Sequence, residues 1–433
     1  METIGIALMG CGTVGSGVAR LLLERGERLT ARAGQRLELR RVLVRDLNKT
    51  RAVELPSSLI TTDLDAIARD PSVHVVAELA GGVDWPRRAI LQLLEAGKDI
   101  VTANKALLSE HGAELFDAGR THGRAIAFEA AVAGGVPIIA ALTQSLAANQ
   151  ITALQAILNG TSNFILTGMS EHGLSYESAL AEAQRLGYAE ADPTLDVDGT
   201  DAAQKLGILA QIAFGVTARG SAIERRGISG LDDMDIRFAR ELGYTIKMVA
   251  EAWLHEQRLA LHVSPVLFRH LHPLAQVRGA YNAIHVVGDV LGDALFYGPG
   301  AGMMPTASAV VADLIDLAVG RAQRTFQTLR LWSGNGSGIT LEPSVSVRTR
   351  FYLRLLVADH PGALADVTRV LAKHHISISS VIQHEALEEH EGDTVPVVLM
   401  SHTTPTRDFR QAVAELDSLG HLRGHSVYFP VAD

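Results

Sequence analysis

The sequence predicts an α/β protein whose first domain is a doubly wound parallel sheet, and two observations carry this prediction. The apolar residues 4–9 run into Gly10-Cys-Gly-Thr-Val-Gly15, and an apolar run at 18–23 follows. This order of strand, glycine turn and helix is typical of a nucleotide-binding βα unit. Short apolar runs then alternate with amphipathic segments over about 130 residues, which is typical of a parallel sheet.

The later elements of this first domain follow from the same periodicities. We predict strands over 37–44, 73–80, 99–102 and 124–128, and helices over 85–96 and 107–122. The ligand of such a sheet lies at the carboxyl ends of its strands. The polar and glycine-rich segments fall there: Gly10 to Gly15, Arg45-Asp46, Glu78 to Gly82, and Thr102-Ala-Asn-Lys105.

The glycine run predicts a cofactor site, against the alternative of an ordinary βα turn. Gly10 allows the tight turn, Gly12 lets the backbone approach a pyrophosphate, and Gly15 lets helix and strand pack closely. The ribose would lie after the second strand, where an acidic residue favours NAD and basic residues favour NADP. Both kinds are present, and the three cations Arg45, Lys49 and Arg51 beside Asp46 favour NADP.

Two further domains follow this first one, which we assign to residues 1–133. Residues 134–320 form an α+β domain with strands over 151–158, 259–266 and 283–291, and helices over 176–186 and 201–214. A glycine and proline loop, 298–307, leads into a helix over 308–320 that we expect to return to the first domain. After a linker, 321–348, residues 349–433 are predicted to fold as strand 351–357, helix 363–374, strand 376–383, charged loop 385–393, strand 394–403 and helix 407–416.

Composition excludes several classes of protein. The chain has 39 Lys and Arg against 48 Asp and Glu, a net charge of -9, and no basic block that would neutralise nucleic-acid phosphates. No apolar run approaches the ~20 residues of a membrane span. The single cysteine, Cys11, cannot form an internal disulfide, and the chain starts without a leader-like segment. We therefore expect a cytoplasmic enzyme that binds neither nucleic acid nor membrane.

The densest group of reactive side chains lies between Gly187 and Lys205, with five carboxylates and one lysine. Residues 190–198 are predicted to be a loop, while Asp201 starts an apolar helix and shares one face with Lys205 four residues on. A solvated acidic loop is one alternative. A calcium loop is another, although Val197 occupies the position where such a loop needs glycine. A partly buried lysine beside a carboxylate can exchange a proton near neutral pH, which favours catalysis.

Three other segments carry candidate site residues. Lys105 follows a strand at the cofactor end of the sheet, where a surface lysine is the alternative. Glu129 to Pro137 joins the first two domains, and such a bend either offers carbonyls to a monovalent ion or serves as a hinge. The run Asn159-Gly-Thr-Ser-Asn163 has donors for a carboxylate, or caps a helix.

Taken together, these motifs resemble homoserine dehydrogenase from residue 1 to about residue 320. The block from Gly187 to Lys205 is the most specific part of the resemblance. The motif Asp359-His-Pro-Gly-Ala-Leu364 resembles an ACT domain, a ferredoxin-like βαββαβ amino-acid sensor. The resemblance thus implies a Rossmann-type NAD(P)-binding domain, an α+β catalytic and dimerisation domain, and a C-terminal ACT domain, without an aspartate kinase.

This resemblance implies the reversible reduction of L-aspartate 4-semialdehyde to L-homoserine by NAD(P)H. It assigns proton donation to Lys205, orientation of lysine and substrate to Asp201, and ammonium binding to Glu190, with Asp196 and Thr161 beside the substrate. Lys105 would lie between nicotinamide and substrate. Cofactor positions are Gly10, Gly12, Thr13, Val14, Gly15, Arg45, Lys105, Gly187 and Gly302. Glu129, Val132, Gly134 and Val136 match a sodium site.

Two expectations concern regulation and assembly. An end-product amino acid such as threonine would bind the ACT domain and lower activity, and ACT domains commonly pair edge to edge, so we expect a homodimer or homotetramer. The alternative from another class is a catalytically weak dinucleotide or amino-acid sensor. The presence of Lys105, Glu190 and Lys205 favours the enzyme.

Overall fold

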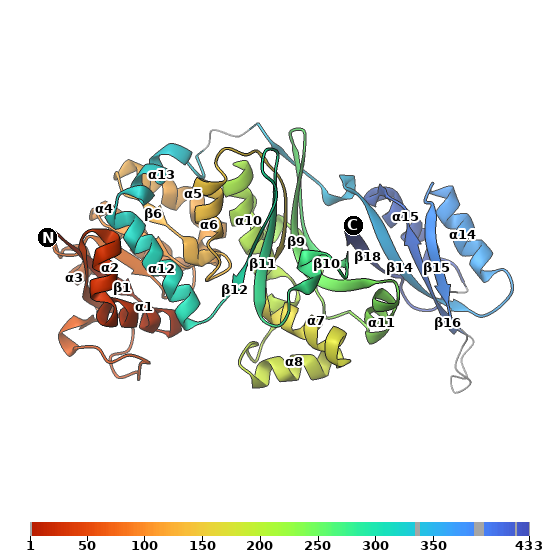
Figure 1. Cartoon of the computed structure of the whole chain (residues 1–433), viewed down its shortest axis with the longest axis horizontal. Helices are drawn as coiled ribbons and strands as arrows, with labels where there is room; N and C mark the ends of the chain where they lie inside the picture. The colour runs from red at the N-terminus through yellow and green to blue at the C-terminus, as the bar shows by residue number, and fades with distance from the viewer. Residues whose placement is uncertain (1, 334–337, 385–393, 421, 433) are drawn as a thin grey trace.

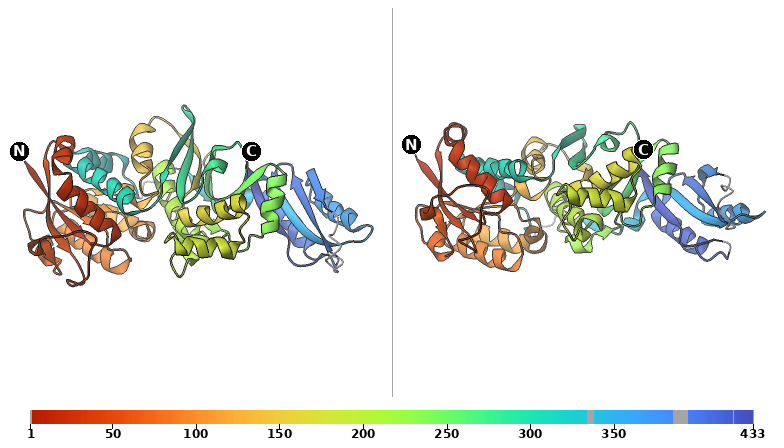
Figure 2. Two further views of the ribbon diagram at one scale, coloured as in Figure 1. Left: turned by 60° about the horizontal axis from the view of Figure 1, so that its bottom comes forward. Right: turned by 90° about the horizontal axis from the view of Figure 1, so that it is seen from below.

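A computed structural model describes residues 2–333, 338–384, 394–420 and 422–432. Three parts lie in a row along the long axis of the molecule, in chain order from the N-terminal end, as both Figure 1 and Figure 2 show. The predicted charged loop at 385–393 lies outside the described residues.

The first part is a six-stranded sheet in the order β3-β2-β1-β4-β5-β6, in which every pairing is parallel. This confirms the doubly wound sheet. Its strands are β1 (Thr3–Met9), β2 (Arg36–Leu43), β3 (Ile60–Thr61), β4 (Val75–Glu78), β5 (Asp99–Thr102) and β6 (Ile126–Ala127). Its helices are α1 (Thr13–Glu24), α2 (Gly26–Ala33), α3 (Asp65–Ala68), α4 (Asp84–Glu95) and α5 (Lys105–Thr121).

The second part is an α+β domain built on an antiparallel sheet. Its order β12-β11-β7-β9-β10 continues into the strands of the third part. The strands are β7 (Ile151–Ile157), β8 (Glu224–Arg225), β9 (Tyr244–His255), β10 (Arg258–Arg269), β11 (Tyr281–Gly288) and β12 (Gly292–Pro299). The helices are α6 (Ile138–Ala140), α7 (Gly160–His172), α8 (Tyr176–Arg185), α9 (Thr194–Val197), α10 (Thr200–Phe214) and α11 (Asp233–Glu241).

Two predicted boundaries in this part are wrong. The single strand predicted over 283–291 ends at Gly288, and a three-residue turn reverses the chain into β12. The helix predicted from residue 308 is α12 (Met303–Ala318) and starts five residues earlier. Pro305 is tolerated there because the amides of a first helical turn have no partner within the helix.

Helix α12 returns to the first domain, as predicted. It packs against α1, where a Cβ on Gly17 would lie 2.9 Å from Met303 and Ala307. Helix α13 (Arg321–Leu329) follows, and its Phe326 stacks on Phe116 of α5 with ring centroids 5.2 Å apart. Strand β13 (Thr340–Glu342) then pairs with β10, so residues 321–348 contain a helix and a strand.

The third part has the predicted βαββαβ order. Its elements are β14 (Arg348–Ala358), α14 (Ala363–Lys373), β15 (Ile378–Gln383), β16 (Thr394–Ser401), α15 (Thr406–Leu416) and β18 (Val427–Ala432), with the short β17 (Thr404–Pro405) beside β14. Both helices pack on one face, where Phe351 stacks on Phe409. Strand β18 also pairs with β10, Leu267 opposite Val431, and this joins the third part to the second in one sheet.

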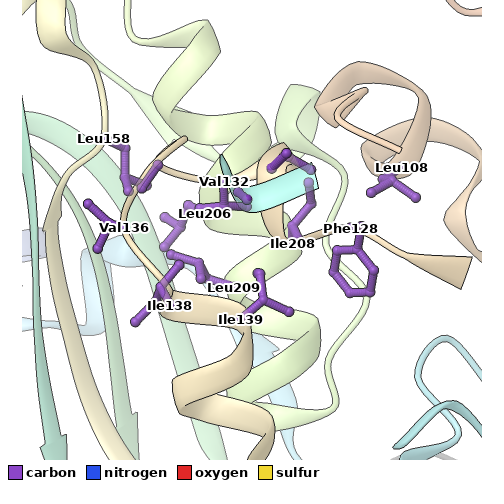
Figure 3. Close-up of a cluster of buried hydrophobic side chains, with 14 of the residues drawn as sticks. Leu108, Phe128, Val132, Val136, Ile138, Ile139, Leu158, Leu206, Ile208 and Leu209 are labelled. Atoms are coloured by element: carbon purple, nitrogen blue, oxygen red, sulfur yellow. The ribbon is translucent and has the colours of Figure 1, made fainter. Parts of the chain in front are cut away.

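A buried apolar cluster joins the first two parts and sets the rotation of α10 (Figure 3). Leu206 and Leu209 of α10 are fully buried against the bend that follows β6, which contributes Val132, Ile138 and Ile139. Among the described residues no single helix has the length and hydropathy to cross a bilayer. Helices α12 and α13 have them only when they are counted together, and this pair is bent by 86°.

Candidate active site

The glycine turn between β1 and α1 has a backbone that side chains would disrupt. Gly10 has φ +108°, and a Cβ there would lie 2.8 Å from the backbone of Leu79. A Cβ on Gly15 would lie 2.3 Å from the Gly10 carbonyl oxygen. The tight turn and the close helix packing predicted from the sequence are therefore both present.

Around Gly12 the turn is open. Among the described residues, a Cβ on Gly12 would meet no atom within 4 Å, and no side chain caps α1, which begins with Thr13 and Val14. Uncapped amides at a helix N-terminus attract an anionic group through the helix dipole and hydrogen bonding. Space and donors together fit a dinucleotide pyrophosphate.

Behind this turn, Glu78 has a structural role. Its buried carboxylate accepts hydrogen bonds from the Thr102 hydroxyl at 2.7 Å, from the Ala80 amide at 2.9 Å and from the Gly81 amide at 3.2 Å. Burial raises the pKa of Glu78, and these donors oppose that rise. The Glu78 side chain therefore fixes the backbone of the loop that follows β4.

Beyond β2, the cations predicted at the ribose position differ in their contacts. Arg45 is exposed, and no hydrogen bond or ion pair joins it to another residue that the structure describes. The Arg51 guanidinium donates instead to main-chain carbonyls of its own loop, that of Lys49 at 2.8 Å among them. Asp46 accepts a hydrogen bond from the Asn48 amide at 2.8 Å. Arg45 is thus available to a ligand.

Two lysines from different domains meet at one carboxylate. Lys205 Nζ lies 2.7 Å from Asp201 Oδ2, and Lys105 Nζ lies 3.1 Å from Asp201 Oδ1. Lys105 is the first residue of α5 in the first part, and Asn104 caps that helix by accepting from the Leu107 amide. Asp201 and Lys205 are one turn apart on α10. This arrangement brings together residues that the sequence places 96 and 100 positions apart.

The lysines keep Asp201 ionised. Burial of this carboxyl opposes its ionisation, but the charges of Lys205 and Lys105 outweigh burial and lower its pKa to about 2. Only 12% of the Lys205 side chain is exposed, and its Nζ also donates to the Leu158 carbonyl at 2.7 Å. An ammonium has three N–H donors. Two are used by the protein, and one remains for a ligand.

Asn159 connects the second acid of the site. Its Nδ2 donates to Asp196 Oδ1 at 2.7 Å and to Asp201 Oδ2 at 3.0 Å, while its Oδ1 caps α7 by accepting from the Ser162 amide. Burial raises the pKa of Asp196, against the effect of this hydrogen bond. Sequence reasoning proposed a carboxylate binder or a helix cap here; the cap is present, and the bridge between two acids was missed.

The other two predicted substrate residues differ in position: Thr161 lies beside Asp196, where it opposes the rise in pKa that burial causes, whereas Glu190 lies apart from the group. The Thr161 hydroxyl donates to the Tyr188 carbonyl at 2.7 Å, which ties α7 to the segment after Gly187. Glu190 is exposed, and its carboxylate contacts no other residue of the group within the described chain. The loop predicted over 190–198 contains the single-turn helix α9. Just before it, Asp192 Oδ1 accepts a hydrogen bond from the Thr194 amide at 3.1 Å.

The bend after β6 is buried and strained. Ala133 and Gly134 have φ of 55° and 51°, and a Cβ on Gly134 would lie 2.4 Å from the Gly300 carbonyl oxygen. The Glu129 carboxylate accepts from the Ile139 and Ala140 amides at 2.9 and 2.7 Å. Burial raises the pKa of Glu129 despite these bonds. Within the described residues no group of three or more His, Cys, Asp or Glu side chains is arranged to hold a metal.

Gly302 directly precedes α12, which packs against α1. Its φ of +116° is one that glycine adopts readily. A cavity of about 820 Å³ lies away from this site, between β10 and the strands of the third part. Its lining includes Glu251, His262, Ser264 and Tyr428, none of which belongs to the lysine and carboxylate group.

Comparison with known proteins identifies each part of the chain. Residues 10–129 match the NAD-binding domain of homoserine dehydrogenase, residues 137–315 match homoserine dehydrogenase itself, and residues 351–421 match the ACT domain. Homoserine dehydrogenases from Pseudomonas aeruginosa and Bacillus subtilis are 41% and 38% identical, over 98% and 97% of this chain and 98% and 96% of their own.

Solved structures agree with these relatives. A homoserine dehydrogenase from Thiobacillus denitrificans is 40% identical, with a TM-score of 0.92 over 100% of this chain and 99% of its own. A hyperthermophilic archaeal homoserine dehydrogenase in complex with NADPH shares the fold at 24% identity, with a TM-score of 0.60 over 74% of this chain and 98% of its own. The chain therefore belongs to the homoserine dehydrogenase family of oxidoreductases acting on CH–OH groups, and carries NAD(P)-binding, catalytic and ACT domains.

Proposed function

We propose that Lys205 delivers the proton when L-aspartate 4-semialdehyde is reduced to L-homoserine. One observation carries this proposal: its ammonium is held at 2.7 Å by both Asp201 and the Leu158 carbonyl, and one donor remains. A hydrogen-bonded ammonium is suited to stabilise and then protonate an alkoxide as charge develops on the substrate oxygen. In the oxidising direction the neutral amine of Lys205 takes the proton back.

When bound, NAD(P)H would supply the hydride. Its pyrophosphate fits the open turn at Gly12, and the amides at Thr13 and Val14 are available to it. We propose contacts from Gly10 and Gly15 in the same turn, and from the further residues Arg45, Lys105, Gly187 and Gly302. Lys105 approaches Asp201 from the cofactor domain at 3.1 Å, which supports its position between cofactor and substrate.

Four residues are proposed to bind the substrate. The exposed Glu190 carboxylate is available to accept the substrate ammonium, and the partly buried Asp196 extends the acidic wall. Asp201 orients Lys205 and the forming hydroxyl, while Thr161 holds the segment before Glu190 through the Tyr188 carbonyl. The alternative of a catalytically weak sensor is not favoured, because the relatives over nearly the whole chain are homoserine dehydrogenases.

We propose a preference for NADPH, supported by Arg45 after β2, which is exposed and has no partner within the described part of the chain. Steady-state kinetics with aspartate semialdehyde and each reduced cofactor test both the reaction and this preference. Arg45→Ala should raise the KM for NADPH about 10-fold, since a charge-assisted bond to a 2′-phosphate is lost, and change the KM for NADH less than about twofold.

Arg69→Ala is the matched control for that experiment, because Arg69 is an exposed arginine of the same domain, paired with Asp65 at 3.0 Å. It should leave both KM values unchanged. Equal increases for NADPH and NADH in Arg45→Ala would contradict the proposed contact with the 2′-phosphate.

The bend after β6 is proposed to hold a structural sodium ion through main-chain oxygens of Glu129, Val132, Gly134 and Val136. All four residues are buried, and the Glu129 carboxylate is occupied by two amides, which leaves carbonyls as the donors. Carbonyl oxygens are suitable ligands for a hard cation.

We propose that threonine binds the turn between β14 and α14 and inhibits the enzyme. Asp359 is exposed there, and no side chain that the structure describes caps α14 at Gly362, so the turn offers an acceptor for an ammonium and donors for a carboxylate. Millimolar threonine should lower activity, and Asp359→Ala should raise the half-inhibiting concentration about 10-fold, the effect of losing one charge-assisted bond, with kcat unchanged.

Asp408→Ala is a control for the threonine experiment, since Asp408 lies in the first turn of the other ACT helix, α15. It should not change inhibition. Activity that is insensitive to millimolar threonine would contradict the proposal. A homodimer or homotetramer also remains a proposal, supported by the outer edge of β15, which pairs with no further strand among the described residues, and the cytoplasmic location stays a prediction.

A further inference from the structure

The Leu158 carbonyl that holds Lys205 has a second donor. Asn282 Nδ2 donates to this oxygen at 3.0 Å, while Lys205 Nζ donates to it at 2.7 Å. Leu158 directly follows β7, and Asn282 is the second residue of the neighbouring β11. The lysine and the asparagine, 77 positions apart, therefore share one main-chain acceptor.

Asn282 is enclosed between this carbonyl and a glycine. Its side chain is 1% exposed, and a Cβ on Gly300 would lie 2.1 to 2.2 Å from three atoms of its amide group. Gly300 lies in the short loop that leads to Gly302 and α12 on the cofactor side. Packing against glycine leaves the amide group almost no freedom to turn.

The amide is also incompletely satisfied. Asn282 Oδ1 is buried and has no hydrogen-bond partner among the described residues. A buried acceptor without a donor costs about 1–3 kcal/mol, so a packed apolar side chain would be the more stable choice for packing alone. An apolar side chain at position 282 could not make the hydrogen bond that Asn282 donates to the Leu158 carbonyl.

We propose that Asn282 is a positioning residue for catalysis: it fixes the Leu158 carbonyl and thereby aims the Lys205 ammonium at the substrate oxygen. This inference rests on the proposed role of Lys205 as proton donor. Asparagine suits the position because its Nδ2 donates. An ionised aspartate would bring an acceptor against the carbonyl, and leucine has no donor.

A double-mutant cycle on the full-length enzyme tests the inference. Asn282→Leu should lower kcat about 10-fold in the wild-type background, because a misaimed proton donor reacts more slowly, and leave the Kd for NADPH unchanged. In the Lys205→Ala background the same change should lower kcat less than about twofold, since the group it aims is absent. Asn282→Asp provides a second, equally sized variant, which has no donor for the Leu158 carbonyl when its carboxyl is ionised.

Asn149→Leu is the matched control, because the Asn149 side chain also donates to a main-chain carbonyl, that of Leu146 at 3.3 Å, but lies in a remote loop. Its kcat should equal that of the wild type. Equal losses from Asn282→Leu in both backgrounds, with native circular dichroism, would overturn the positioning role alone. Full activity in Lys205→Ala by itself would instead overturn the proposed proton donor, and with it this inference.

Discussion

Replacement of Lys205 by alanine is expected to lower kcat by ~10²–10⁴, the usual scale for removing a positioned general acid, while the Kd for NADPH barely changes. Asp201 and the Leu158 carbonyl both bind the ammonium of Lys205. The turn at Gly12, where we expect the cofactor pyrophosphate, lies in a different domain, so cofactor binding should not depend on this side chain. Stopped-flow reduction of aspartate semialdehyde and a fluorescence titration with NADPH measure the two quantities separately.

Two variants make this first prediction specific. Lys205→Met keeps the length of the side chain and should lose as much activity as alanine, because the proton and not the packing is missing. Lys373→Ala removes an exposed lysine that pairs with Glu415 in the ACT domain, and should keep wild-type kcat. An equal loss of NADPH binding in Lys205→Ala would show that the lysine supports the structure instead.

Asp235→Ala is expected to destabilise the junction between the catalytic and ACT domains by about 3–5 kcal/mol. Asp235 is fully buried on α11 and accepts from Arg354 Nε at 2.6 Å, Arg354 Nη2 at 2.9 Å and Tyr352 Oη at 2.9 Å, both partners on β14. Burial and the neighbouring carboxylate raise the pKa of Tyr352, so its phenol remains a donor. Removing the carboxylate leaves a buried guanidinium without its hydrogen-bonded counter-charge.

Urea unfolding combined with hydrogen exchange at the β14 amides measures this loss. Asp233→Ala is the matched control, an exposed aspartate two residues earlier in the same helix, and should change stability by less than about 0.5 kcal/mol. If both variants lost similar, small amounts, the ion pair would not hold the ACT domain to the catalytic domain.

Local patterns predicted most of the secondary structure. The apolar alternation located β5 at Asp99–Thr102, and the turn before Ala363 located the start of α14. Errors occurred where a short signal was misread: a proline in a first helical turn delayed the predicted start of α12, and the turn at 289–291 was read as strand. Propensity over a few residues does not distinguish these cases, because neighbouring segments decide between them.

In the candidate site, too, the sequence predicted the local contacts and missed those between distant segments. The four-residue spacing between Asp201 and Lys205 predicted their pairing, since helix geometry alone brings them together. The bond of Lys105 to the same carboxylate, the Asn159 bridge between two acids and the support from Asn282 depend on where separate strands and helices lie. No pattern near Asn282 distinguishes it from an ordinary strand residue.

By itself, the sequence determined the glycine turn, the helical lysine and carboxylate pair, the order of strands and helices, and through its motifs the family. Only the tertiary structure decided that two domains share Asp201, that β18 joins the ACT sheet to β10, and that Lys205 and a buried asparagine donate to the same Leu158 carbonyl. The physical reason is range: turns and helices follow from backbone geometry within a few residues, whereas these contacts arise when packing brings distant segments together.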